Sequence, residues 1–463
     1  MTSPPPSLWW SQFADASPRP ALRDAVDVDV AIIGGGYTGL WTARELLRRD
    51  PHLHVVVLEA EVCGFGASGR NGGWVSALFP APATTIVARH GRDAFQRQRR
   101  VLQDAVVSLG VAAAADSIEC DYRRGGTLTF ARSSAQVARA QRELASAAEL
   151  GVGEEDLRWL GPEDLAGVAT VHGARGATFS PHCARIHPAR LVRGLADVVE
   201  RLGARVHEGT RVTRVVAGTS SRRARVITRG ATVRARYVVR ATEGFTVAMT
   251  RQRRTLAPLY SLMIATAPLN DSWWRDYGFA QSPTFGDERH LLVYGQRTAD
   301  NRLAFGGRGS PYHFGSTVEP RFDANPAVFA HLATSLRELF PTLDTEITHQ
   351  WGGPLGMPRD RLPSVIVDHA TGLATAGGYT GDGVTLSYVC ANALADLIVT
   401  PATPTPYSEL PFVNLASRRW ELEPLRWAGI NAGIALATYA DHYEGRHEGE
   451  SRATTWLSRL MGV

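Results

Sequence analysis

A chain of 463 residues with 44% hydrophobic and 21% charged residues has the composition of a globular protein and is too long for one simple core, so we expect two domains. Its net charge of +5 includes 50 basic residues that are all arginine and are interleaved with acids, which argues against a nucleic-acid-binding protein. The lack of lysine excludes Schiff-base chemistry and an ordinary P-loop nucleotide hydrolase, because both need that side chain.

The N-terminal segment and the cysteines indicate a reducing compartment. Residues 1–26 are rich in proline, lack the basic and apolar regions of a signal peptide, and are expected to wrap the surface. No run of 18 apolar residues occurs, so we expect no membrane-spanning helix. Four scattered cysteines without a C-x-x-C pair predict neither disulfides nor a metal site. We therefore expect a cytoplasmic protein.

The first strong pattern is an apolar strand at residues 28–33, a glycine turn, and a helix at residues 38–49. Gly34, Gly36 and Gly39 fit the spacing G-x-G-x-x-G. In this fingerprint the glycines allow a tight turn, a close approach of the backbone to a pyrophosphate, and close packing of the helix on the strand. The amino end of the helix attracts phosphates.

A second strand at residues 54–58 ends in Glu59, which lies 25 residues after Gly34. A carboxylate at this place accepts hydrogen bonds from a ribose 2′-hydroxyl and repels a 2′-phosphate. The strand, turn, helix and acid together predict a dinucleotide site for FAD or NAD rather than NADP.

The next segment, residues 64–73, reads G-F-G-A-S-G-R-N-G-G. Its small residues let the loop lie against a ring system. Arg70 and Asn71 can donate hydrogen bonds to a pyrophosphate or to the edge of a flavin.

The middle of the chain alternates between helical and strand patterns. We expect helices at 91–115, 134–149, 188–202 and 327–340, and strands at 126–131, 205–216, 224–228 and 232–239, with further strands between 255 and 315.

A second unit of strand, glycine loop and helix lies near the C-terminus, at residues 371–376, 377–383 and 384–399. The amino end of this helix can offer N–H groups to a reduced flavin, which is anionic near N1 and O2. The stretch 420–443 is expected to pack on the protein or on a second subunit, and an amphipathic helix on a membrane surface is the alternative.

Taken in order, these strings resemble the FAD-binding signature of the D-amino-acid oxidase superfamily, which includes glycine oxidase and monomeric sarcosine oxidase. The likeness is greatest to the gamma-glutamylputrescine oxidase group. Further matching strings are R-A-T-E-G-F-T at 240–246, F-G-G-R at 305–308, W-G-G-P-L-G-M-P-R-D-R-L-P at 351–363 and G-Y-T-G-D-G-V at 378–384.

The resemblance covers about residues 27–400 and implies a set of FAD contacts. The diphosphate and the adenosine ribose would be held by Gly34, Gly36, Thr38, Gly39 and Glu59, and the pyrophosphate and isoalloxazine would lie against Ser68, Arg70, Asn71, Gly72 and Gly73. Val212 would meet adenine through its backbone, Ala241 and Thr242 would line the nucleotide, and Gly381, Gly383, Val384 and Thr385 would contact the flavin's pyrimidine side. The expected cofactor contacts also include Tyr37, Ala60, Gly66, Ala67 and Gly356.

The chain departs from the family pattern in three ways. No cysteine occurs where sarcosine oxidases attach flavin, and Arg70 and Asn71 stand where other relatives carry an attaching histidine, so we expect non-covalent FAD. Met357 stands where glycine oxidase-like enzymes carry an arginine that clamps the substrate carboxylate, which favours amines over simple α-amino acids. Because no lysine can assist oxygen, another cation takes that role or the enzyme is a dehydrogenase.

Four residues are candidates for substrate contact or catalysis: Trp74, Tyr260, Tyr294 and Arg308. Trp74 follows the flavin loop, the tyrosines lie on expected strands of the substrate domain, and Arg308 follows a glycine turn. Aromatic rings can enclose a cationic or apolar amine. Core packing for the aromatic residues and a structural ion pair for Arg308 remain open.

We expect an α/β protein with the two-domain glutathione-reductase-like FAD fold. It would consist of a Rossmann-type FAD domain from residues 27–90, 185–250 and 350–400, an antiparallel-sheet substrate domain from 91–184 and 251–349, and a helical extension from 401–463.

The implied reaction is oxidation of the C–N bond of a primary or secondary amine, polyamine or gamma-glutamyl amine to an imine that hydrolyses, with O2 as acceptor. Alternatives are an amino-acid oxidase or dehydrogenase of the same family, a flavin monooxygenase, and a flavin-binding protein without activity. The oligomeric state is left open.

Overall fold

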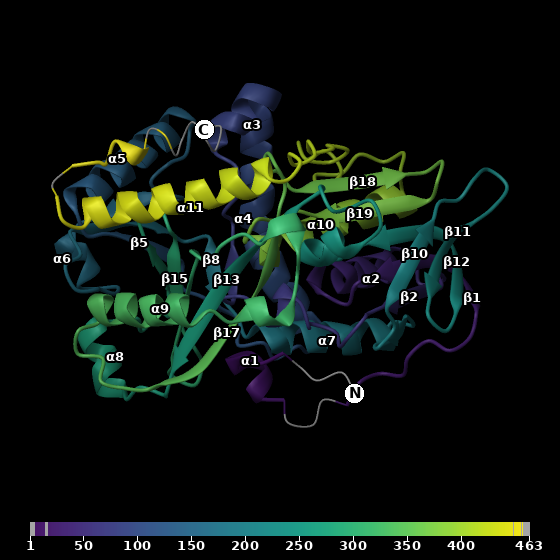
Figure 1. The fold of residues 1–463 in the computed structure, drawn as a ribbon, viewed down its shortest axis with the longest axis horizontal. Helices are drawn as coiled ribbons and strands as arrows, with labels where there is room; N and C mark the ends of the chain where they lie inside the picture. The colour runs from purple at the N-terminus through teal and green to yellow at the C-terminus, as the bar shows by residue number, and fades with distance from the viewer. Residues whose placement is uncertain (1–4, 14–16, 448, 455, 457–463) are drawn as a thin grey trace.

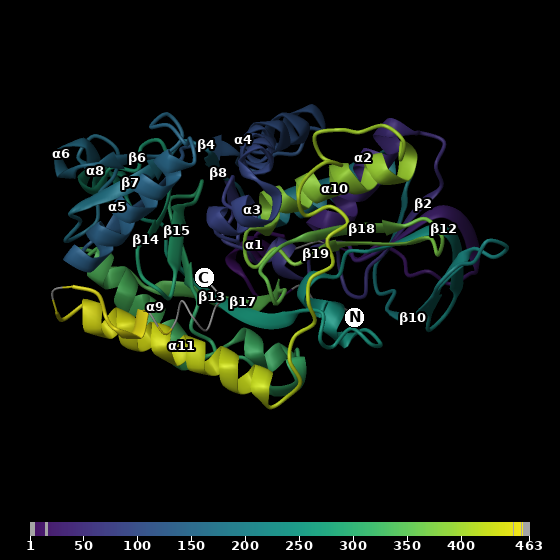
Figure 2. The ribbon, with the colours of Figure 1, turned by 90° about the horizontal axis from the view of Figure 1, so that it is seen from above.

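The computed structural model describes residues 5–13, 17–447, 449–454 and 456. Two large β-sheets lie side by side along the length of the molecule, and helices cover their outer faces (Figure 1). A small third sheet, made of β3 (Trp74–Ser76), β8 (Cys183–Arg185) and β4 (Arg123–Arg124), lies with the long helices of the first sheet (Figure 2).

The first sheet has a parallel centre, in which β1 lies between β2 and β12. These inner strands are rich in valine and isoleucine because helices or other strands bury both of their faces. β9 extends the sheet beyond β2, β19 pairs with the end of β12, and the remaining strands add antiparallel edges. The strands are β1 (Val26–Ile33), β2 (Val55–Leu58), β9 (Arg205–His207), β10 (Val212–Val216), β11 (Ala224–Thr228), β12 (Thr232–Arg240), β18 (Ser364–Asp368) and β19 (Leu373–Gly377).

Helices from distant parts of the chain share one core above this sheet. They are α2 (Tyr37–Arg49), α4 (Arg92–Ala115), α7 (Pro188–Arg201) and α10 (Gly383–Val399). α2 packs against both α7 and α10, and α10 also packs against α4. In α7 the side chains of Leu191, Leu195 and Val198 form the buried apolar face of the helix. α3 (Ala83–His90) leads into α4.

The second sheet runs in the order β17-β13-β16-β15-β14-β5-β7-β6. Its neighbouring strands are antiparallel except for the parallel pair of β14 and β5. The strands are β5 (Thr127–Ala131), β6 (Arg158–Leu160), β7 (Gly176–Ser180), β13 (Ala257–Thr266), β14 (Thr284–Asp287), β15 (Val293–Arg297), β16 (Leu303–Gly307) and β17 (Ile347–Met357). Its helices are α5 (Ser134–Glu149), α6 (Pro162–Leu165), α8 (Asp271–Tyr277) and α9 (Pro326–Leu339). The predicted α/β fold with two sheets is confirmed.

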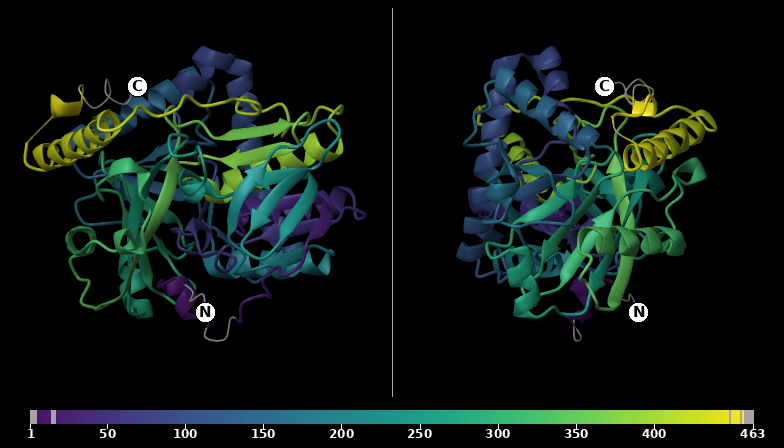
Figure 3. Two further views of the ribbon diagram at one scale, coloured as in Figure 1. Left: turned by 45° about the vertical axis from the view of Figure 1, so that its right-hand side comes forward. Right: turned by 90° about the vertical axis from the view of Figure 1, so that its left-hand side faces the viewer.

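The last helix, α11 (Leu425–Glu444), runs along the outside of the second sheet (Figure 3). Glu444 accepts hydrogen bonds from Arg139 Nη2 at 2.6 Å and from the His290 ring at 3.0 Å, which fixes the end of the helix to α5 and to the loop before β15. Within the described residues, no helix is long and apolar enough to cross a membrane.

Four expectations differ from the structure. The N-terminal segment does not only wrap the surface, because α1 (Leu8–Ser11) buries three large side chains. The single strand expected at 205–216 is two strands, separated by a turn at Gly209, whose φ is +61°. β17 belongs to the second sheet, although residues 350–400 were assigned to the FAD domain. α4 packs on α10 of the first sheet, although residues 91–184 were assigned to the substrate domain.

Candidate active site

The two glycine loops, which are far apart in the sequence, meet in the structure. Thr38 Oγ1 on the first turn of α2 lies 2.9 Å from the hydroxyl of Tyr379, which precedes α10. The third glycine-rich segment joins them, because the Tyr37 N–H donates to Ser68 Oγ at 2.9 Å. The three strings that resemble an FAD signature therefore surround one site at the amino ends of α2 and α10.

The first turn has no room for side chains. Gly34 has a φ of +109°, and a Cβ at this position would lie 2.5 Å from the carbonyl oxygen of Ala241. A Cβ at Gly36 would lie 2.9 Å from Ser68 Oγ. A Cβ at Gly39 would overlap the carbonyl oxygen of Gly34. The glycines thus serve the tight turn and the close packing that the fingerprint predicts.

Glu59 lies at the end of β2 and next to this turn. Its carboxylate accepts hydrogen bonds from the N–H groups of Gly35 at 2.7 Å and Glu61 at 2.9 Å. Burial raises the pKa of the Glu59 carboxyl. The backbone carbonyl of Glu59 accepts from Thr210 N at 2.7 Å, two residues before Val212 at the start of β10. This arrangement suits the adenosine end of a dinucleotide.

The polar residues of the loop at 66–73 hold the loop itself. Arg70 Nη1 donates to Asp323 Oδ2 at 2.6 Å and to the carbonyl of Gly352 at 2.9 Å. Asn71 Nδ2 donates to the carbonyls of Ala67 and Ser68, and its Oδ1 accepts from Gly73 N at 2.8 Å. Both side chains were expected to reach a pyrophosphate or a flavin edge. In the structure their hydrogen bonds fix the loop to β17 and to itself.

Helix α1 supports the same loop from behind. Trp9 Nε1 donates to the carbonyl of Asn71 at 2.8 Å, and the Trp9 ring packs edge-on against Trp351 and His187. Trp351 Nε1 in turn donates to the carbonyl of Arg70 at 2.8 Å. Two buried tryptophans therefore hold two successive carbonyls of the predicted flavin loop.

Glu243 is a half-buried acid that joins three segments of the site. It follows Thr242 at the end of β12 and has a φ of +39°, a strained value for this residue type. Its carboxylate accepts hydrogen bonds from Gly378 N at 2.9 Å, Gly356 N at 3.2 Å and Tyr379 N at 3.3 Å. The sequence pattern singled out Ala241 and Thr242 in this string but not the acid that follows them. An acid next to a glycine at a strand end was the available signal.

A Glu243→Gln substitution is expected to change how stability depends on pH. Burial raises the pKa of the Glu243 carboxyl to about 7. The folded chain then binds a proton that the unfolded chain releases, so the wild type loses stability as the pH rises from its ordinary carboxyl value through 7. The loss is roughly 1–2 kcal/mol once solvent screening at this half-buried group is allowed for. Thermal unfolding of both proteins at pH 5 and pH 8 measures it. Parallel pH dependence of the two proteins would contradict the assignment.

Three of the four candidate substrate residues cluster between the loop at 66–73 and the second glycine loop. The Tyr294 ring packs edge-on against Trp74 at 6.0 Å, and its hydroxyl lies 2.8 Å from Ser261 Oγ. Arg308 Nη2 donates to the carbonyl of Thr380 at 2.6 Å, which ties the end of β16 to the second glycine loop. A Cβ at Gly72 would lie 2.6 Å from Tyr294, so Tyr294 lies directly against the loop at 66–73.

Tyr260 does not join this cluster. It neighbours Ser261 on β13, so its side chain points to the opposite face of the sheet. There it packs edge-on against His313 and Phe322. The structure therefore favours the core-packing alternative for Tyr260.

The residues present fit a flavin dinucleotide. The glycine turn leaves its backbone open to a ligand, and the amino ends of α2 and α10 face the same site. Among the described residues, Thr380 Oγ1 and Thr385 Oγ1 are buried without a hydrogen-bond partner, and both lie at the second glycine loop. Buried hydroxyls without partners suit a ligand that offers polar edges. No group of three or more His, Cys, Asp or Glu side chains in the described residues is arranged to hold a metal.

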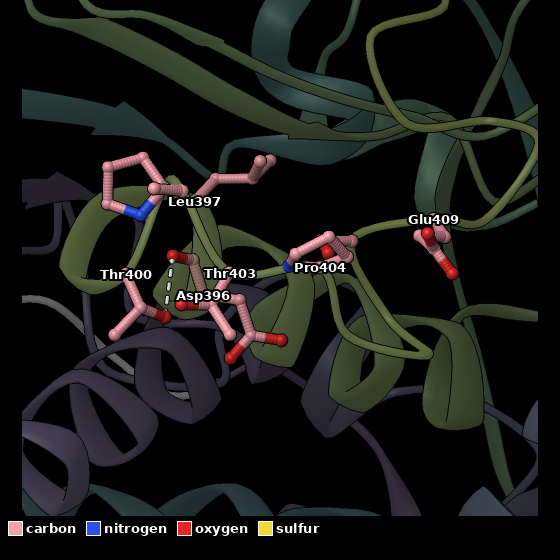
Figure 4. Close-up of a pocket in the computed structure, with 9 residues that line it drawn as sticks. Asp396, Leu397, Thr400, Thr403, Pro404 and Glu409 are labelled. Carbon is pink, nitrogen blue, oxygen red and sulfur yellow. Dashed lines mark hydrogen bonds between the residues drawn. The ribbon is translucent and has the colours of Figure 1, made fainter.

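A separate cavity lies at the other end of α10 (Figure 4). It has a volume of about 220 Å³ and is bordered by Asp396, Thr400 and Glu409. Its one buried carboxylate is already in use, because Asp396 accepts from Arg49 Nε at 2.8 Å and from Thr405 Oγ1 at 2.6 Å. It also lies at the carboxyl end of the helix, away from the glycine loops, so it is not the reaction site.

Comparison with known proteins agrees with this geometry. Residues 29–397 match the family model described as FAD dependent oxidoreductase. The chain belongs to this family of flavoenzymes.

Named relatives and solved structures cover most of the chain. It is 28% identical over 403 residues to gamma-glutamylputrescine oxidoreductase of Escherichia coli, covering 86% of this chain and 90% of that protein. It is 29% identical over 390 residues to a probable oxidoreductase, OrdL, of Rhizobium meliloti, covering 83% and 86%. Its fold is similar to that of glycine oxidase from Geobacillus kaustophilus, with a TM-score of 0.69, 20% identity, and coverage of 84% and 98%. L-proline dehydrogenase from P. horikoshii gives a TM-score of 0.66 at 18% identity, with coverage of 86% and 96%.

Proposed function

We propose that this flavoenzyme oxidises the C–N bond of an amine to an imine, which water then hydrolyses to a carbonyl compound and an amine. The observation that carries the proposal is the cluster of Trp74, Tyr294 and Arg308, placed where the loop after β2 and the loop before α10 come together. The name of the Escherichia coli relative supports an amine substrate.

The bound FAD would supply the redox chemistry, and the side chains would bind and orient the substrate. Trp74 and Tyr294 form a half-buried aromatic wall that suits a cationic or apolar amine. Arg308 places a positive charge beside the loop that precedes α10, where it can hold a carboxylate on the substrate or assist oxygen. In a chain without lysine, an arginine here would be the cation that oxygen chemistry requires.

Anaerobic titration of the purified yellow protein tests this function. Primary and secondary amines, polyamines, gamma-glutamyl amines and amino acids are each added while the flavin absorbance is followed. Bleaching by amines but not by NADH is expected. Bleaching by NADH alone would instead support a flavin monooxygenase. Oxygen-electrode traces then separate an oxidase from a dehydrogenase.

An amino-acid substrate is the second candidate, and one observation favours it. Arg308 and Arg361 make no ion pair with any described residue, although both are half-buried and the charge of Arg308 acts on Arg361. Two such guanidinium groups suit a carboxylate. The names of the similar structures, a glycine oxidase and an L-proline dehydrogenase, agree with this alternative. Faster bleaching by amino acids than by the matching decarboxylated amines would establish it.

We also propose that FAD is held without a covalent bond. The segment 351–363 contains no cysteine, and the four cysteines of the chain are all buried. Acid precipitation of the holoenzyme is expected to release all of its flavin into the supernatant. Yellow colour that stays with the washed pellet would contradict non-covalent attachment.

A further inference from the structure

Asp382 carries a carboxylate that the described structure leaves without a hydrogen-bond partner. It occupies the N-cap position of α10, yet its side chain makes no cap hydrogen bond. An N-cap aspartate normally accepts from the first turn of its helix, which stabilises the helix by about 1 kcal/mol. The side chain is half-buried, so its carboxylate faces a space that solvent or a ligand can reach. A carboxylate held in this way is available to a cation.

The groups around Asp382 place it at the candidate substrate site. Arg308 at the end of β16 acts on it electrostatically, and Asp382 in turn acts on Cys183 of β8. β8 pairs with β3, in which Cys183 lies opposite Ser76, two residues after Trp74. Asp382 therefore lies among Arg308, the small third sheet and the second glycine loop. The aromatic wall of Trp74 and Tyr294 borders the same region.

The charges around this carboxylate leave it free to bind a cation. Arg308 lies beyond ion-pair distance from it and is instead held by the carbonyl of Thr380. Cys183 is a buried thiol whose pKa is raised to about 12, so it carries no charge near neutral pH. Tyr294 is likewise neutral, because burial raises the pKa of its hydroxyl. A carboxylate beside aromatic rings is a common arrangement for an organic ammonium ion.

We propose that Asp382 binds the protonated amine of the substrate and accepts its proton. This inference rests on the proposed function. An aliphatic amine arrives at neutral pH as an ammonium ion, which has no lone pair on nitrogen. When one N–H proton moves to Asp382 Oδ, the N–H bonding electrons remain on nitrogen as a lone pair. That pair then forms the C=N bond as the α-C–H bond breaks and its two electrons leave as hydride to the oxidant, FAD. Asp382 later returns its proton to water.

The pKa of Asp382 supports this role. Burial raises it to about 6, and the Arg308 charge opposes part of that rise. Above that value the group is a carboxylate and can bind a cation, whereas below it the group is neutral. A base with a pKa near the working pH is well matched to proton transfer.

Calorimetry with tetramethylammonium chloride tests cation binding apart from turnover, because this ion can be neither oxidised nor deprotonated. The wild-type holoenzyme is expected to bind it at pH 7.5 and to lose most of that affinity at pH 5. Asp382→Asn is expected to weaken binding at pH 7.5 by about tenfold or more, the equivalent of ~1.4 kcal/mol. Asp382→Glu keeps the charge and is expected to retain binding. Glu409→Gln, which removes the same charge at the far end of α10, is the matched control and leaves binding unchanged.

The pH profile of anaerobic flavin reduction tests the proton transfer. In the wild type, reduction by an amine is expected to rise with an apparent pKa near 6. In Asp382→Asn the midpoint moves up towards the pKa of the free ammonium ion, because the amine must then lose its proton in solution. Equal tetramethylammonium affinity and equal pH profiles in the wild type and the Asn variant would overturn the proposal. If no amine reduces the wild-type flavin, the proposed function fails, and the calorimetry still decides whether Asp382 forms a cation site.

Discussion

Replacing Gly39 by alanine is expected to give a chain that purifies with little FAD and unfolds more easily. The new Cβ would overlap the backbone carbonyl oxygen of Gly34 and lie 3.1 Å from Ile32 Cγ2. α2 can accept it only by moving away from β1. Overpacking of this kind costs about 1–3 kcal/mol, and the same loss in cofactor binding lowers affinity by roughly 5- to 150-fold. The ratio of flavin to protein absorbance and a denaturant titration measure both effects.

The control for this substitution lies on another helix. Gly429 is a helical glycine of α11, and a Cβ built there meets nothing within 4 Å. Gly429→Ala is expected to keep full FAD content and to stabilise the helix by about 0.5–1 kcal/mol. A Gly39→Ala protein with normal flavin content would show that the first turn does not hold the cofactor.

Replacing Trp9 by alanine is expected to destabilise the protein by about 3–5 kcal/mol, the range for a buried tryptophan. Trp9 is 2% exposed, and its indole N–H holds the carbonyl of Asn71. The substitution is also expected to weaken FAD binding, because the loop at 66–73 loses one of its two tryptophan supports. Denaturant unfolding and FAD titration of the apoprotein measure the two effects.

Two further variants separate the sources of this loss. Trp9→Phe keeps an aromatic ring but removes the N–H, and the lost hydrogen bond costs about 1 kcal/mol. Trp427→Ala removes a tryptophan that is 44% exposed on α11 and is expected to change stability by about 0.5 kcal/mol or less. A Trp9→Ala variant as stable as Trp427→Ala would mean that α1 does not support the loop.

The parts of the fold that were predicted from sequence are those whose signals are local. β1, α2 and β2 form a unit in which apolar runs, glycine spacing and the final acid all lie within about 30 residues, the size of a βαβ unit. α5, α7 and α10 were predicted within two residues of their observed bounds, because each shows a helical apolar pattern or follows a clear turn.

The parts that escaped prediction depend on contacts between distant segments. Leu8–Ser11 is too short to show helical periodicity, and its burial is decided by the loop at 66–73 and by Trp351. Tyr260 lies on β13 and Tyr294 on β15, and only the pairing of these strands with their neighbours decides which face each side chain takes. The role of Glu243 depends on three backbone donors from β17 and the second glycine loop, which lie more than 100 residues further along the chain.

The contact between Thr38 and Tyr379 spans 341 positions of the chain and sets the order in which the enzyme can be made. At synthesis rates of about 5–20 residues per second, the loop before α10 leaves the ribosome roughly 20–70 s after the glycine turn before α2. Capture of FAD therefore has to wait until translation is nearly finished. Until then the nascent β1–α2–β2 unit exposes the apolar face that α10 later covers, and transiently exposed apolar surface of this kind favours aggregation.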